Sequence, residues 1–448
     1  MPVSRRSLLG RLAVAYLSAA AAAYPARKAP APAQPGDDPP SRRFHVSHYD
    51  VQLHPRLVTK TITGTTVMTL SLDDGERNIV VNRGSLQIDA VREGAEPRPF
   101  EVAGTTLRVS LEPGRPAARE LTIDYHGAPS SGLVFVPERD QIYTLFSTSQ
   151  WMPAIDEPDA RATLRLRVTI PRGWTGAASG REVARRSSGD MQQVEWRQAR
   201  AVPTYTFGFA VGRFVTATER AAGATLRYIG GAVTAGDLRT IFRETPQMIA
   251  FFESRAGVPL PGGEYAQALV ARTVGQEMAG LSVMSDEYGR AVLSDPSAIG
   301  LIAHELAHQW WGNMVTCQAF THFWLNEGFA TYMAAAYREH RFGREVYLRD
   351  VASMRAHVEQ VRERGNDRSL VFPEWRRPSA DDRTVVYQKG AYLLHELRER
   401  LGDQPFWAGV RLYTTRYFGR SVTTADFRAA MEESSRSDLS GFFERYIY

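Results

Sequence analysis

The sequence predicts a multidomain fold in which an antiparallel β domain is followed by an α+β, mostly helical domain. The chain has 448 residues, enough for two or three domains at about 150 residues each. Hydrophobic residues make up 43% and charged residues 23%, which excludes a mostly disordered chain. Short β-rich runs give way to long helical patterns after about residue 222, and this change indicates two different halves.

The charge does not indicate a nucleic-acid partner. Lys and Arg number 54 against 49 Asp and Glu, a net charge of +5, and the two signs are interspersed rather than gathered in a basic stripe. The single cysteine, Cys317, excludes an internal disulfide framework and an all-cysteine metal site. We expect Cys317 to be a small buried residue.

Residues 1–26 are predicted to be an export signal peptide. Basic residues precede an apolar stretch at 12–23, which is too short to span a bilayer because a span needs about 20 apolar residues. Arg5 and Arg6 resemble a twin-arginine export signal. We therefore expect a periplasmic or extracellular protein with no membrane span in the mature chain, and a flexible Pro/Ala-rich linker at 27–42.

Residues 43–218 are predicted to form a β-sandwich-like domain. Apolar residues alternate with polar ones, as at Leu164, Leu166 and Val168, which is the pattern of a half-buried strand. Gly, Pro, Asn and Asp separate the runs. Strands are expected at 45–53, 61–72, 79–82, 105–111, 120–125, 163–170 and 205–215.

Residues 219–448 are predicted to form the second, mostly helical domain. Strands are expected at 267–271 and 281–285. Helices are expected at 237–256, 296–312, 324–341, 344–364, 382–401, 403–417, 424–434 and 439–447. Asp295 is a candidate cap for the second of these, Pro296 suits its first turn and Gly312 can end it.

The segment His304-Glu305-Leu306-Ala307-His308 carries the strongest chemical signal. Residues i and i+4 of a helix share a face about 6 Å apart, so the two imidazoles can bind one Zn²⁺. Glu305 can then reach a water molecule at the metal, which is the metalloprotease arrangement. A solvated helix face with two histidines is the alternative. The surrounding helix is apolar nearly all round, however, and buried polar groups there need a partner such as a metal.

Glu327 is the predicted third ligand. It lies nineteen residues after His308, on the expected core side of another apolar helix, where an acid is otherwise hard to explain. Two histidines and one carboxylate leave a fourth position open, as a catalytic zinc site requires. We expect one Zn²⁺ per chain.

These motifs resemble the zinc aminopeptidases of the gluzincin class, the aminopeptidase N family. The resemblance covers about residues 43–448. Five stretches carry it: HELAHQWWGNMVT (304–316), WLNEGFATY (324–332), TYTFGFAVGRF (204–214), MPAIDEPDARATLRLRVTIP (152–171) and VVYQKGAYLLHELRERLGD (385–403). It implies a thermolysin-like catalytic domain in a short, bacterial-type member without the large C-terminal helical domain of longer relatives.

The resemblance also implies roles for single residues. His304, His308 and Glu327 would bind zinc, and Glu305 would be the general base that passes a proton from water to the leaving amine. Tyr387 would hydrogen-bond the developing oxyanion. The implied activity is hydrolysis of N-terminal residues from peptides by a protein that we expect to be a monomer.

The match weakens at the family's G-x-M-E-N signature. Here Gly275-Gln276-Glu277-Met278 stands in its place, and all but the last of these four residues are candidates for substrate binding. Glu277 would pair with the substrate's free α-amino group, but Gln276 and Met278 are departures that leave a zinc endopeptidase or a dual-specificity hydrolase open. A catalytically inactive binding scaffold is a third hypothesis. Gln150 is a weak candidate for a second polar contact.

Overall fold

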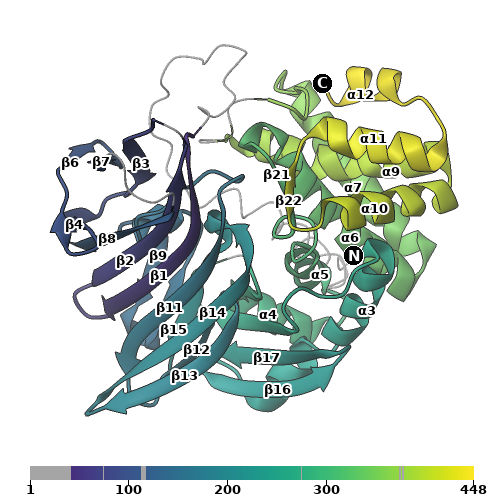
Figure 1. The fold of residues 1–448 in the computed structure, drawn as a ribbon. Helices are drawn as coiled ribbons and strands as arrows, with labels where there is room; N and C mark the ends of the chain where they lie inside the picture. The colour runs from purple at the N-terminus through teal and green to yellow at the C-terminus, as the bar shows by residue number, and fades with distance from the viewer. Residues whose placement is uncertain (1–41, 74, 113–117, 274, 373–374, 376–377) are drawn as a thin grey trace.

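The computed structural model describes residues 42–448 except 74, 113–117, 274, 373–374 and 376–377. The predicted signal at 1–26 lies outside these residues, and so does the predicted linker at 27–42 except its last residue. Figure 1 shows a β-rich half beside a mostly helical half, in the predicted order along the chain. Among the described residues, no helix is both long and apolar enough to cross a membrane.

The β-rich half contains three sheets. The largest has the strand order β13-β14-β11-β1-β2-β8-β4-β5, a four-stranded sheet has the order β12-β15-β10-β9, and a small sheet has the order β3-β7-β6. Pairing is antiparallel except between β1 and β11, which are parallel. The bounds are β1 Phe44–Arg56, β2 Thr61–Leu72, β3 Asn78–Asn82, β4 Gln87–Glu93, β5 Glu96–Pro97, β6 Phe100–Ala103, β7 Thr106–Ser110, β8 Ala118–Gly127, β9 Leu133–Val136, β10 Gln141–Thr144, β11 Arg161–Pro171, β12 Thr175–Ala178, β13 Arg181–Ser188, β14 Met191–Pro203 and β15 Phe209–Gly212.

Strand β11 shows why these sequences form strands. Leu164, Leu166 and Val168 are buried in the core of the β-rich half, whereas Arg165 and Arg167 alternate with them on the other face. Both arginines form ion pairs with an aspartate of β1. The alternation that predicts a half-buried strand is therefore present in the structure.

The second half is built on a five-stranded mixed sheet of order β16-β17-β18-β20-β19, which leaves β19 at an edge. The predicted boundary after residue 218 falls inside β16. The strands are β16 Val215–Ala221, β17 Ala224–Gly230, β18 Glu264–Val270, β19 Gly275–Met278 and β20 Leu281–Ser285, with a small pair β21 Val315–Cys317 and β22 Arg420–Val422.

Helices cover this sheet and form the largest core. They are α2 Ala235–Ile241, α3 Thr245–Ala256, α4 Asp286–Ser294, α5 Gly300–Ala307, α6 Trp324–Phe342, α7 Arg344–Glu363, α8 Ala380–Thr384, a π-helical turn Val385–Lys389, α9 Gly390–Leu401, α10 Asp403–Tyr417, α11 Thr424–Ser435 and α12 Ser440–Tyr446. Single 3₁₀ turns lie at Pro137–Arg139, Thr148–Gln150, Thr204–Thr206 and Phe320–His322.

Two predicted segments are interrupted. The predicted helix at 237–256 is two helices, because Pro246 in the first turn of α3 has no N–H to continue the preceding one. The predicted strand at 205–215 is also interrupted, since a 3₁₀ turn precedes β15 and the chain then enters β16 in the other sheet.

The predicted helix at 296–312 is shorter than expected. The Asp295 carboxylate accepts hydrogen bonds from the backbone N and Oγ of Ser297, at 3.0 and 2.7 Å, and this turn delays the helix to Gly300. The helix ends at Ala307, and His308 is its C-cap residue with helical dihedrals. The four-residue spacing of the two histidines is thus kept in the last turn.

The two halves share an apolar layer. Tyr143 and Ala210 of the four-stranded sheet pack in one cluster with Ala268 and Val283 of the five-stranded sheet. The end of β10 therefore lies against β19, where the Thr144 hydroxyl is 3.7 Å from the sulfur of a methionine on that strand.

Two glycines set the closest approach of α6 and the segment leading into α9. A Cβ added to Gly390 would lie 3.0 Å from the Cα of Gly328 and 3.6 Å from the Cβ of Trp324. Gly328 directly follows Glu327, and Gly390 comes three residues after Tyr387. This crossing therefore fixes the separation of the two elements that carry those side chains.

Gly390→Ala is expected to lower the free energy of unfolding by about 1–3 kcal/mol, because the added methyl meets backbone. Gly441→Ala in α12 is the matched control: its Cβ would enter open space, so removing a helical glycine there should stabilise the protein by up to about 1 kcal/mol. Urea unfolding of both variants measures the difference, and equal effects would contradict the close crossing.

Candidate functional site

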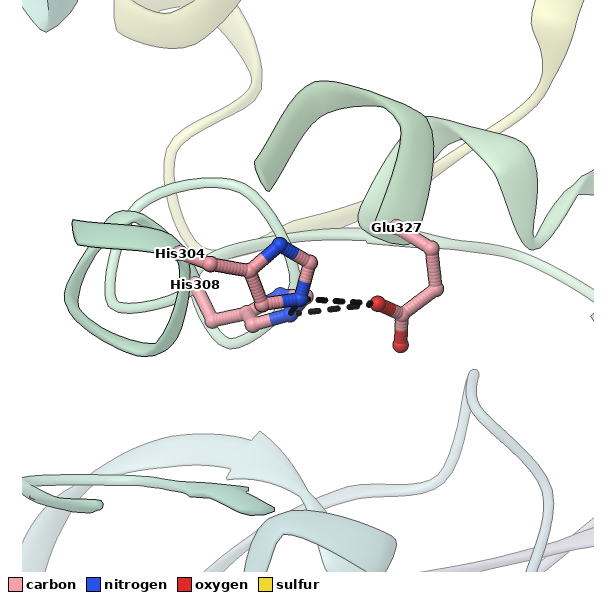
Figure 2. Close-up of side chains that lie close together, drawn as sticks. All are labelled: His304, His308 and Glu327. Atoms are coloured by element: carbon pink, nitrogen blue, oxygen red, sulfur yellow. Dashed lines mark hydrogen bonds and ion pairs between the residues drawn. The ribbon is translucent and has the colours of Figure 1, made fainter. Parts of the chain in front are cut away.

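Three potential metal-ligand atoms meet between α5 and α6. The Nε2 atoms of His304 and His308 lie 3.1 Å apart, and each is 3.3 Å from Oε2 of Glu327. Figure 2 shows both imidazoles directed at this carboxylate from the neighbouring helix. All three side chains are buried, with at most 3% of the residue surface exposed.

The dimensions of this triangle fit a zinc ion. Nitrogen and oxygen ligands lie about 2.0–2.1 Å from zinc, and tetrahedral angles then place the ligand atoms about 3.3 Å from one another. The observed separations are 3.1, 3.3 and 3.3 Å. Two imidazoles and one carboxylate are also the donor types that zinc prefers. The residues present could therefore hold a tetrahedral cation and leave one position open.

Each imidazole is oriented through its other nitrogen. Nδ1 of His308 lies 3.1 Å from the backbone O of Trp311, and Nδ1 of His304 lies 3.4 Å from Oγ1 of Thr331. Thr331 is one turn after Glu327 on α6. Such partners fix the ring orientation and leave Nε2 available to a metal, an arrangement common at protein metal sites.

Electrostatics favour a positive charge at this point. Burial alone would raise the pKa of Glu327, but the charge of His308 and hydrogen bonds from both imidazoles lower it to about 2. Burial would lower the pKa of His308, but Glu327 and Glu277 raise it to about 10. For His304 burial prevails and the pKa is lowered. The carboxylates thus create a field that attracts a cation.

Glu305 lies on the same helix as the two histidines. It is buried, and its Oε2 has no hydrogen-bond partner among the described residues. Gly275 of β19 packs so closely on this carboxylate that any Cβ there would collide with it. Burial raises the pKa of Glu305 well above its ordinary value. A buried carboxylate with a free oxygen is placed as a proton acceptor requires.

Tyr387 lies against the imidazole of His304. It projects from the π-helical turn, and its ring stacks on that of His304 with centroids 5.9 Å apart and planes 10° from parallel. Burial, followed by the charge of Glu327, raises the pKa of Tyr387 well above its ordinary value, so the phenol remains a donor. π-helical turns within helices often occur at functional sites.

Glu277 reaches the cluster from the edge strand β19. It is buried, and it forms a second group of potential ligands with Glu305 and His308, whose ligand atoms all lie within 4.8 Å of one another. Burial raises the pKa of Glu277 to about 7, against the opposing effect of His308. Gln276 is also buried, but its amide is directed at Glu277 and at the backbone of Phe146.

Two predictions about neighbouring residues have different outcomes. Cys317 is buried, as expected, in the core of the helical half. Gln150 is hydrogen-bonded to Ser85, with Oε1 3.0 Å from the serine Oγ, so its amide is engaged within the β-rich half.

A chain of hydrogen bonds, which was not predicted from the sequence, joins the two halves of the structure. Nδ2 of Asn326 donates to the Tyr205 hydroxyl at 2.7 Å, and that hydroxyl donates to the backbone O of Gly312 at 3.3 Å. Oδ1 of Asn326 accepts from the backbone N of Cys317 at 3.0 Å. The residue before Glu327 is therefore anchored to the β-rich half. The signal in the sequence that could have indicated this contact is that Tyr205 and Asn326 each lie in a stretch resembling the family.

Comparison with known families agrees with this site and fold. The Peptidase M1 N-terminal domain matches residues 45–206, and the Peptidase family M1 domain matches residues 272–446. The chain belongs to peptidase family M1. The second match contains the two histidines and Glu327.

Relatives of this M1 family member include archaeal and bacterial proteins. It is 22% identical to Probable aminopeptidase 2 of Sulfurisphaera tokodaii over 83% of this chain and 50% of that protein. It is 26% identical to aminopeptidase N of Lactobacillus delbrueckii subsp. lactis over 85% of this chain and 48% of that protein. The chain thus spans about half the length of these relatives.

A solved structure shares the whole described architecture. A mutant M1 zinc metallopeptidase from Deinococcus radiodurans is 25% identical and superposes with a TM-score of 0.73, covering 91% of this chain and 95% of that one. This likeness confirms the predicted fold class, a β-rich domain followed by a mostly helical domain.

One equivalent of Zn²⁺ is expected to bind and to raise the thermal unfolding midpoint, because a ligand that binds only the folded state stabilises it. His308→Ala should weaken zinc binding by about 100-fold or more, since even changes around metal ligands cost 10–100-fold. His357→Ala on α7 is the matched control and should bind zinc as the wild type does. Equal zinc affinity in the two variants would contradict the site.

Proposed function

We propose that this protein is a zinc-dependent aminopeptidase that removes N-terminal residues from peptides. The observation that carries the proposal is the buried triangle of His304, His308 and Glu327, with Glu305 and Glu277 beside it. Family membership supports peptide hydrolysis, and the names of the relatives support the exopeptidase mode.

Glu305 acts as the general base in this proposal. When bound at the triangle, zinc supplies an acidified water molecule and polarises the scissile carbonyl group. The unpartnered Oε2 of Glu305 accepts a proton from the attacking water and delivers it to the nitrogen of the leaving amine.

Tyr387 stabilises the charge that develops on the carbonyl oxygen. Its hydroxyl is a proton donor at neutral pH, and burial, which raises its pKa further, keeps it protonated. Stacking on His304 holds the ring beside the metal ligands. A fixed donor aimed at developing charge acts mainly in the transition state.

Glu277 pairs with the free α-amino group of the substrate. It lies on the edge strand of the five-stranded sheet, and an extended peptide can bind alongside such a strand. The closeness of Glu277 to Glu305 and His308 places the first peptide bond beside the reacting groups. We further propose that the signal-like residues 1–26 direct the protein out of the cytoplasm.

The exopeptidase mode is tested with one peptide in two forms. The protein should hydrolyse the free-amine peptide with a kcat/KM at least about 10²-fold above that of its N-acetylated form, because losing a buried ion pair costs about 3 kcal/mol or more. Hydrolysis is followed by mass spectrometry at matched concentrations. Equal rates, or internal cleavage of the acetylated peptide, would identify an endopeptidase or dual-specificity hydrolase instead.

Two substitutions separate the catalytic roles. Glu305→Gln should retain zinc and lose about 10²–10⁴-fold in kcat, as expected for a general base. Tyr387→Phe should lower kcat by about 10²–10³-fold with little change in KM, because its contact forms mainly in the transition state. Tyr446→Phe in exposed α12 is the control. If Glu305→Gln binds zinc and keeps full activity, Glu305 is not the general base. If Tyr387→Phe loses zinc, the proposed role of Tyr387 in stabilising the oxyanion is contradicted.

A further inference from the structure

Gln276 joins two parts of the candidate site through a fully satisfied side-chain amide. Its Nε2 donates to Oε2 of Glu277 at 2.7 Å and to the backbone O of Glu277 at 2.9 Å. Its Oε1 accepts a hydrogen bond from the backbone N of Phe146 at 3.0 Å. Gln276 is 2% exposed, so these three bonds are shielded from water. One buried amide therefore links the acid of the edge strand to a loop of the other half.

The loop that Gln276 holds has a conformation that side chains disfavour. Phe146 and Ser147 both adopt left-handed backbone dihedrals, with φ of 51° and 34°. Such a pair of non-glycine residues persists only where the surroundings impose it, and these conformations concentrate at functional sites. The loop follows β10, which packs against β19. The hydrogen bond that the Phe146 backbone N donates to Gln276 is one of the contacts that impose this geometry.

The backbone of Phe146 lies near the amine-binding acid. Its backbone N is linked to the Glu277 carboxylate through one amide group, so this N lies within about 8 Å of the carboxylate by covalent geometry. The Phe146 residue is 39% exposed, whereas most large apolar residues of this half are buried. A phenyl ring carried on this part of the backbone has the reach to contact the side chain of a residue whose α-amino group pairs with Glu277.

We propose that Gln276 is a specificity-determining positioning residue that holds Glu277 and Phe146 as one rigid corner. The Phe146 ring then forms a wall for the substrate's N-terminal side chain and favours large apolar side chains over small ones. This inference rests on the proposed aminopeptidase function and deepens it. Gln276 does not touch the reacting atoms, since it acts by turning one carboxylate oxygen of Glu277 away from the amine and by fixing the loop.

The hydrogen bonds that join Glu277 and Phe146 require a side-chain amide at position 276. A methionine fills a similar volume but offers neither the N–H donors nor the carbonyl acceptor. In Gln276→Met the Glu277 carboxylate loses its partner and the Phe146 backbone N loses its acceptor. The first loss weakens amine binding for every substrate, whereas the second loosens the wall and reduces discrimination between side chains.

The test uses amides of Phe, Leu and Ala and compares kcat and KM in the wild type and four variants. Phe146→Ala should lower the preference for Phe over Ala, measured as a ratio of kcat/KM, by about 3- to 10-fold. Gln276→Met should lower the same ratio similarly and should also raise KM about tenfold for all substrates. Phe100→Ala, on β6 and equally 39% exposed, is the matched control and should leave the ratio unchanged.

The double variant Gln276→Met/Phe146→Ala should lose no more selectivity than either single variant, because both act through the same wall. Zinc content and the thermal unfolding midpoint are measured in each variant, and a variant that binds zinc fully while showing these changes supports the positioning role. Unchanged ratios in both single variants, or an additive loss in the double one, overturn the inference while leaving the aminopeptidase function intact. A wild type that hydrolyses no free-amine amide overturns both.

Discussion

The structure depends on the cost of burying three metal-ligand groups in an apolar interior. His304, His308 and Glu327 are removed from water, and burial without compensation would disfavour every charged form among them. Their mutual arrangement already lowers that cost, but the two imidazole nitrogens face each other across 3.1 Å. A dication at the centre of the triangle would satisfy all three at once, and this requirement explains why they converge.

The fold converts this local requirement into a complete site. The Gly328–Gly390 crossing sets α6 against the segment that carries Tyr387, and the close packing of Gly275 on Glu305 sets β19 beside α5. The β-rich half is part of the same construction, since Tyr205 anchors Asn326 and the loop at Phe146 holds Gln276. The proposed reaction is therefore supported by both halves.

Much of the fold and the central cluster could be predicted from the sequence because their signals are local. Strand alternation and long helical patterns predict the two halves, and the four-residue spacing of His304 and His308 follows from one helical turn. Glu327 could be predicted because an acid in an apolar helix needs a partner. Helix α4 could have been predicted too, since Ser285 caps it and two acids follow.

Other features depend on contacts between residues far apart in the chain. The predicted start of α5 was wrong, because the Asp295 carboxylate accepts hydrogen bonds from Ser297 in a turn instead of capping the helix. The bond between Phe146 and Gln276 joins residues 130 positions apart, and no periodicity in either segment indicates it. The sequence shows that a glutamine stands at position 276, but its hydrogen bonds to Phe146 and Glu277 are known only from the structure.

Anomalous diffraction at the zinc absorption edge, from crystals grown with Zn²⁺, locates the metal relative to these side chains. We expect one strong peak per chain, about 2.0–2.1 Å from Nε2 of His304, Nε2 of His308 and a carboxylate oxygen of Glu327. A zinc peak coordinated by Glu277 or Glu305 in place of Glu327, or no peak within this cluster, would contradict this expectation.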